Sequence, residues 1–176
     1  MSQLTALSLS IGVLGAVWAY LALGPLSGYV LVWAGFIAWG CYFHTGANTN
    51  ALTKTIVGTA YGAIIGWIAL LIIVNVPMPS LGGLWAPIVV GATVFLLVIV
   101  ASISALSVVP ANVYGYAAIV AYSLQTTPPA PATGPLQNLT SGSFANPLIL
   151  LIVSLVIGAL FGYASNQLTG VLAKKA

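Results

Sequence analysis

Uncharged polar and aromatic side chains are the main groups in this sequence that could bind or guide a solute. The 176 residues include three lysines, one histidine, and neither aspartate nor glutamate. Amides and hydroxyls can replace the hydrogen bonds that water makes to a small neutral molecule, and aromatic rings can set the width of a narrow path. We expect such a path to be lined by Trp33, Phe36, Tyr42, His44, Pro110, Asn112, Tyr114 and Tyr116.

The absence of carboxylates argues against several classes of transporter. Proton-coupled carriers usually place a carboxylate or histidine within the membrane to load and unload the proton. The single histidine, His44, lies at a predicted helix end, where it is either a pH-sensitive gate or an interfacial side chain with one face in water. Hard cations prefer oxygen ligands that include carboxylates, and the sequence has no TVGYG-like run that could bind potassium. We therefore do not expect ion-coupled transport or cation conduction.

The same residue inventory argues against catalysis and against cofactors. No acidic side chain can serve as a general base or orient a histidine, and no serine or cysteine lies in a recognisable nucleophile motif. Cys41 and His44 are three residues apart, but two ligands do not make a metal site. The three lysines form no basic stripe that could bind nucleic acid. We expect neither an enzyme nor a metal or cofactor site.

The elements that must position these side chains are membrane helices. The chain is 61% hydrophobic and 2% charged, whereas a soluble domain carries about a quarter charged residues. A spanning helix needs roughly 20 residues, so the chain has room for about six spans and short loops. We predict one all-α polytopic transmembrane domain over residues 1–176, with helices at about 4–23, 29–43, 54–74, 84–102, 105–124 and 147–168.

A short internal similarity suggests that the bundle is a repeat of three helices. The third predicted helix contains Gly62-Ala63 followed by Gly66-Trp67, and the sixth contains Gly158-Ala159 followed by Gly162-Tyr163 at the same spacing. An odd number of spans in each half (about 4–76 and 84–170) would make the repeat inverted, as in many transporters and channels. Glycines at this spacing also let helices approach closely, and we expect this packing role for Gly58, Gly62, Gly66, Gly158 and Gly162.

If the repeat is real, the second and fifth predicted helices correspond to each other. The second is short and carries Gly35 among aromatic residues, and the fifth carries Pro110 and Gly115. Proline and glycine inside a span free backbone groups that must find partners or line a wet cavity. Short or interrupted segments in corresponding positions are the best sequence pointer to a substrate site, so we assign the path to these two helices.

Lysine placement predicts the orientation of the chain in the membrane. Lys54, Lys174 and Lys175 fall on one side of a six-helix topology, and the positive-inside rule makes that side, with both termini, cytoplasmic. Aromatic residues near span ends typically anchor helices at the membrane surface, and we expect this role for Trp18, Tyr20, Trp85 and Tyr163.

The connection at 125–146 is the one long loop. Its residues are polar but uncharged, and it is too long for a simple link between two helices. Three interpretations are open: a disordered loop, as its composition favours, a lid over a channel mouth, or a contact between subunits.

Several short motifs, in the same order along the chain, carry a resemblance to a known family. They are Trp33-Ala34-Gly35-Phe36, then Tyr42-Phe43 with Gly46, then Val109-Pro110 with Gly115, and finally Gly158 with Phe161-Gly162-Tyr163-Ala164. On these residues the sequence resembles the YcdZ-like family of small bacterial inner-membrane proteins of unknown function. The resemblance implies an inner-membrane location and a multi-helix bundle, but no substrate and no functional residues. The sequence departs from that pattern in its longer 125–146 loop and its lack of acids.

Together these features favour a passive channel or facilitator for a small neutral solute such as urea, ammonia or a short amide. We expect the protein to lie in the bilayer of the bacterial inner membrane as a homo-oligomer, and we take a trimer as its working oligomeric state. The alternative is a structural or accessory subunit that packs against a larger membrane protein, with the glycine faces and the long loop as docking surfaces.

Overall fold

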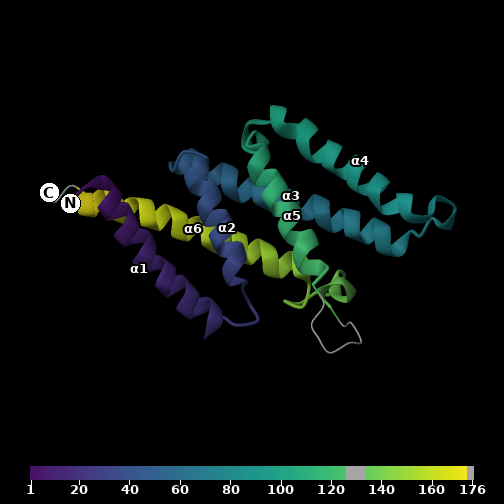
Figure 1. The fold of residues 1–176 in the computed structure, drawn as a ribbon, viewed down its shortest axis with the longest axis horizontal. Coiled ribbons are helices and arrows are strands. Elements are labelled where there is room, and N and C mark those ends of the chain that lie inside the picture. Colours follow the sequence, from purple (N-terminus) through teal and green to yellow (C-terminus); the bar gives the residue numbers. More distant parts are fainter. Residues whose placement is uncertain (126–133, 174–176) are drawn as a thin grey trace. The chain divides into compact units, whose positions relative to one another are not determined.

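Six α-helices form the structure, a computed structural model that describes residues 1–125 and 134–173 (Figure 1). Short 3-10 segments precede α4, follow α4, precede α5 and interrupt the long loop. No strand occurs in the described residues, so the predicted all-α class is confirmed. The α-helices are α1 (Gln3–Leu23), α2 (Val32–His44), α3 (Thr49–Asn75), α4 (Trp85–Ile99), α5 (Val109–Ser123) and α6 (Pro147–Ala173).

Four segments are long and apolar enough to span a membrane. They are α1, α3, α6 and the stretch Pro79–Ser102, which is α4 with its flanking 3-10 turns. The other two helices, α2 with 13 residues and α5 with 15, are about 20 and 22 Å long at 1.5 Å per residue. A bilayer core is about 30 Å thick, so α2 and α5 are too short to cross it as straight helices.

Pro110 does not interrupt α5, contrary to the sequence prediction. The helix begins at Val109, so Pro110 lies in its first turn. The missing N–H of proline has no intrahelical partner there, and its fixed φ suits a helix start. The break lies earlier, where residues 100–108 form two 3-10 turns around an extended Ile103.

The helices form two compact units. Unit 1 comprises residues 1–56 with the part of α6 from Val153, and unit 2 comprises Val57–Ile152. Unit 1 therefore holds α1, α2 and most of α6, while unit 2 holds most of α3 with α4 and α5. Each unit thus combines the first two helices of one predicted half with the last helix of the other.

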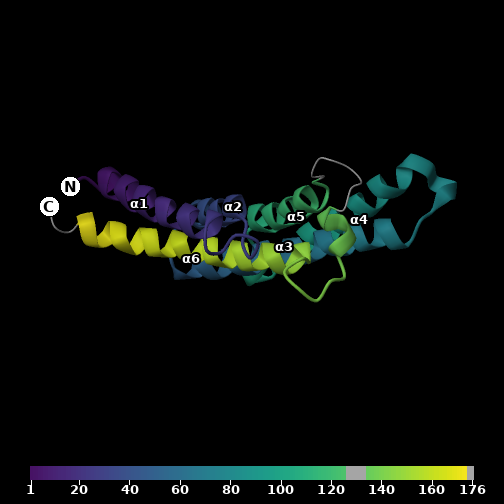
Figure 2. The same ribbon diagram turned by 90° about the horizontal axis from the view of Figure 1, so that it is seen from below.

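Unit 1 is held together by close contact between α6 and α2. A Cβ atom on Gly158 would overlap the carbonyl oxygen of Gly35, so only glycine permits this approach. The hydroxyl of Ser154 accepts a hydrogen bond from the Leu31 N–H at 2.8 Å, which satisfies the start of α2. Figures 1 and 2 show the start of α1 beside the end of α6, so the first and last described helical turns lie at one end of this unit.

Aromatic side chains fill the core of unit 1. Trp18 is fully buried, packs against Gly35, and donates from its indole nitrogen to the Val32 carbonyl at 2.9 Å. Trp39 donates to the Ser165 hydroxyl at 3.1 Å. Because Trp18 is buried among helices, the prediction that it anchors the chain at the membrane surface is wrong.

Unit 2 uses the same kind of contact between α3 and α5. A Cβ on Gly62 would overlap the Asn112 carbonyl oxygen, and a Cβ on Gly115 would overlap that of Thr59. The adjoining core contains Ala69, Val89, Leu97 and Tyr116. The packing role predicted for Gly62 agrees with this geometry.

The glycine contacts of the two units match position by position. Gly62 meets Asn112, and Gly66, one turn later, meets Tyr116 and Ile119. In unit 1, Gly158 meets Gly35, and Gly162 meets Trp39 and Tyr42, at the same spacings along both helices. The unit boundaries also fall at the same dipeptide, Ile-Val, at equal distances before Gly62 and Gly158. The orientation of the two halves in a membrane, which defines an inverted repeat, stays a prediction.

The described part of the long loop, residues 134–146, is folded against unit 2. Trp67 donates from its indole nitrogen to the Leu139 carbonyl at 2.8 Å, and Leu139 is buried. The Asn146 amide donates to the carbonyls of Leu139 and Ser141 at 3.0 and 2.8 Å. Disorder is therefore the wrong interpretation for this part, and residues 126–133 lie outside the described chain.

Replacing either central glycine with alanine should destabilise the protein. Gly62→Ala and Gly158→Ala each force two main chains apart, and overpacking of this kind costs about 1–3 kcal/mol. Gly12→Ala and Gly91→Ala are matched controls, because a Cβ there meets nothing within 4 Å. Unfolding of the purified protein in mixed micelles, followed by tryptophan fluorescence, measures the difference. Equal stability of all four variants would contradict the close approach of the helices.

Candidate functional site

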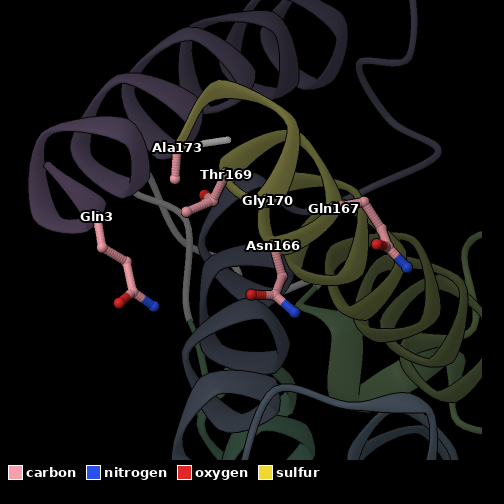
Figure 3. A pocket seen from close by; sticks show the side chains of 6 residues that line it. All are labelled: Gln3, Asn166, Gln167, Thr169, Gly170 and Ala173. Atoms are coloured by element: carbon pink, nitrogen blue, oxygen red, sulfur yellow. The ribbon is translucent and has the colours of Figure 1, made fainter. Parts of the chain in front are cut away.

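An open pocket of about 380 Å³ lies between the first turn of α1 and the last turns of α6. Among the described residues, the side chains that line it are uncharged, and the polar ones offer amide and hydroxyl groups. Figure 3 shows the lining residues, which are Gln3, Asn166, Gln167, Thr169, Gly170 and Ala173.

The helix period places four of these residues on one face of α6. Asn166, Thr169, Gly170 and Ala173 are spaced by three and four residues, which brings them above one another on that face. Gly170 and Ala173 are small and leave the hollow open. Opposite them, the Ser2 hydroxyl accepts from the Thr5 N–H at 3.1 Å and caps α1, which holds Gln3 in the first turn.

Asn166 connects the pocket to α2. Its amide nitrogen donates to the Ala47 carbonyl at 2.7 Å and to the Tyr42 hydroxyl at 3.3 Å. Ala47 has a positive φ of 53°, a conformation that costs energy for a residue with a Cβ, and the bond from Asn166 helps to hold it. Tyr42 is fully buried and contacts the ring of Tyr163 edge-on.

The predicted path residues of α2 separate into two groups. Phe36 and His44 are exposed, and Trp33 is half-buried. Tyr42, in contrast, is buried, and its hydroxyl accepts a hydrogen bond from Asn166 of the polar pocket. The sequence pattern could not separate these residues, since all four occur within one short helix.

The predicted path residues of α5 separate in the same way. Tyr114 is exposed and Pro110 is half-buried. Asn112 and Tyr116 are buried, and the Tyr116 hydroxyl lies 3.0 Å from that of Thr93 on α4. The eight predicted residues therefore lie partly on the exposed faces of α2 and α5 and partly in the cores of the two units.

Asn112 stabilises the broken segment between α4 and α5. Its amide nitrogen donates to the carbonyls of Leu106 at 3.0 Å and Leu97 at 3.4 Å. Its oxygen is buried without a hydrogen-bond partner and faces Gly58, where a Cβ would lie only 2.8 Å away.

Sequence reasoning missed the pocket residues. The sixth helix was predicted to end at residue 168, so Thr169, Gly170 and Ala173 fell outside it. Asn166 and Gln167 form an amide pair in a largely apolar helix, which is the signal that could have located the pocket.

Asn112→Leu should lower the stability of the fold. It leaves the Leu97 and Leu106 carbonyls without their amide donor, and a buried polar group without a partner costs about 1–3 kcal/mol. Tyr114→Leu on the exposed face of α5 is the control, with an expected effect within about 0.5 kcal/mol. Fluorescence-monitored unfolding in mixed micelles measures both. If Asn112→Leu is as stable as the wild type but loses solute permeability, Asn112 lines the path.

Comparison with known proteins identifies the family but no activity. A family model described as "Protein of unknown function (DUF1097)" matches residues 8–170, a range that reaches into all six helices. No curated protein and no solved structure matches the chain. Since the matched range covers well over half of the sequence, this chain belongs to the DUF1097 family of proteins of unknown function.

Proposed function

We propose that this helical membrane protein is a passive facilitator for small neutral solutes, and that α2 and α5 border its path. The observation that carries the proposal is the pair of short helices. Each is the middle helix of one predicted half, and each is preceded by a segment that is not α-helical, at residues 24–31 and at residues 100–108 with their two 3-10 turns. Such a pair of short segments in corresponding positions is typical of substrate pathways.

Short helices point to a pathway because backbone polar groups without hydrogen-bond partners are costly in lipid. A short helix leaves its flanking segments within the depth of the bilayer, where unsatisfied N–H and C=O groups cost several kcal/mol each. Irregular backbone is tolerated at that depth only where protein buries it or where it lines a water-filled cavity. The matched glycine contacts support a three-plus-three repeat in which α2 and α5 occupy corresponding positions.

The exposed faces of the short helices carry no acidic side chain and no lysine. Phe36, Gly40 and His44 are exposed on α2, and Val113, Ala117 and Ala121 are exposed at matching positions on α5. These positions of α2 and α5 correspond when the two helices are aligned by their glycine contacts, so we assign them to the path. A neutral lining without carboxylates suits an uncharged solute such as urea, ammonia or a short amide better than an ion.

The remaining parts of the proposal follow the sequence. We propose a bacterial inner-membrane location, as the YcdZ-like resemblance implies, and a homo-oligomer with a trimer as the working number. The lysines place both termini in the cytoplasm under the positive-inside rule. We propose no catalytic role, because the chain has neither aspartate nor glutamate.

Solute permeability of proteoliposomes tests the proposal. Stopped-flow light scattering should show faster entry of urea or acetamide than into empty liposomes. Gly40→Trp should abolish the increase, because the indole ring occupies the proposed path on α2. Gly91→Trp on α4 is the matched control and should permeate like the wild type, since both glycines are exposed and neither has a neighbour within 4 Å of its Cβ position.

Two results would contradict the proposal. Equal loss in Gly40→Trp and Gly91→Trp would show that the α2 face is not the path. Wild-type permeability equal to that of empty liposomes, for every solute tested, would favour the accessory subunit and a search for its membrane partner.

A further inference from the structure

We infer that the pocket between α1 and α6 binds small primary amides, the chemical class of urea and acetamide, as the water-facing mouth of the path. This inference rests on the proposed function, and it narrows the solute class. Its evidence is the chemistry of the lining, the size of the pocket, its link to α2 and a comparison with the equivalent positions of α3.

The lining offers the groups that a primary amide needs. Gln3 carries an acceptor oxygen and an NH₂ donor, and Gln167 adds an acceptor oxygen and the N–H that its bond to the Tyr163 hydroxyl leaves over. Asn166 and Thr169 offer acceptor oxygens, because the Asn166 NH₂ donates to Ala47 and Tyr42 and the Thr169 hydroxyl donates to the Ser165 carbonyl. A primary amide can pair with either glutamine through its C=O and N–H groups at once. Ammonia has no carbonyl and makes no such two-point pair, so this lining favours urea and short amides over ammonia.

The size and openness of the pocket suit a first binding place rather than a filter. A volume of about 380 Å³ holds roughly thirteen waters at about 30 Å³ each. A urea-sized solute therefore enters with part of its hydration shell. The polar lining can replace that shell stepwise, with Gln3 on α1 and Asn166 on α6 (Figure 3).

Asn166 links the pocket to the helix assigned to the path. Its amide nitrogen bonds the Ala47 carbonyl just after α2 and the Tyr42 hydroxyl within α2. The pocket is therefore built onto the end of α2 where His44 is exposed. A solute held at Asn166 lies at the start of the exposed α2 face.

The shared packing of the two units does not require a polar pocket. Gly162 on α6 and Gly66 on α3 make equivalent contacts, so positions in the two helices can be compared by counting from these glycines. On α6, the residues that follow Gly162 include Asn166, Gln167, Thr169 and Gly170. The residues of α3 at those positions are Leu70, Leu71, Ile73 and Val74. At these equivalent positions the amides and the hydroxyl occur on α6 and not on α3, as expected for a binding site.

Side-chain amide NMR of the full-length protein in detergent micelles tests the inference. The glutamines of the chain are Gln3 and Gln167 in the pocket, and Gln125 and Gln137 in unit 2. With glutamine labelled by ¹⁵N, a titration with acetamide should shift the Gln3 and Gln167 signals saturably and leave the other two unchanged. Thr169→Val should weaken the saturable shift, while Asn75→Leu, which removes an exposed amide at the end of α3, should not.

The outcomes separate this inference from the proposed function. The inference is overturned if acetamide shifts none of the four glutamine side-chain signals, or if it shifts all four together without saturation. Either result would show that the pocket is only a water-filled hollow. If Gln3→Leu loses acetamide binding but keeps wild-type permeability, the pocket is not the mouth of the path, and the inference fails while facilitation stands. If acetamide binds saturably but the wild type is impermeable, binding stands and facilitation fails.

Discussion

The close approach of α6 to α2, and of α3 to α5, is the interaction on which the rest of the structure depends. Helices in lipid gain no hydrophobic driving force from association, so van der Waals contact and interhelical hydrogen bonds must hold them together. Gly158 and Gly62 permit this contact, because their missing Cβ atoms leave room for a facing main chain. Without it, α2 and α5 would lack the support that short helices need in a membrane.

The same lack of water explains how the polar side chains are used. Ser10, Thr93 and Thr169 are buried, and each donates its hydroxyl proton to a carbonyl one turn earlier in its own helix. Asn112 and Ser154 bond backbone groups beside the starts of the short helices. These five buried side chains thus satisfy backbone groups, whereas Gln3 and Gln167 line an open pocket.

Features that depend on local composition and spacing could be predicted from the sequence. The number of helices, the glycine packing face and the shortness of α2 follow from hydropathy and residue spacing. The role of Pro110 was mispredicted, because helix ends are uncertain by several residues and this proline lies in a first turn. Trp18 and Asn112 could not be placed, since their burial depends on the residues that face them, Gly35 and Gly58, from other helices. The pocket escaped prediction because it combines the two ends of the chain.

Thiol accessibility tests most directly whether α2 and α5 border a water-filled path. Cys41, the only cysteine of the chain, is buried, so a Cys41→Ser background allows single cysteines to be placed at Phe36, Val113 and Phe95. All three side chains are exposed in the structure, with Phe95 on α4 at 63%. If the account is right, a charged, membrane-impermeant thiosulfonate modifies Phe36→Cys and Val113→Cys in proteoliposomes much faster than Phe95→Cys. Equal protection of all three would place the exposed faces of α2 and α5 in lipid or against protein and contradict the account.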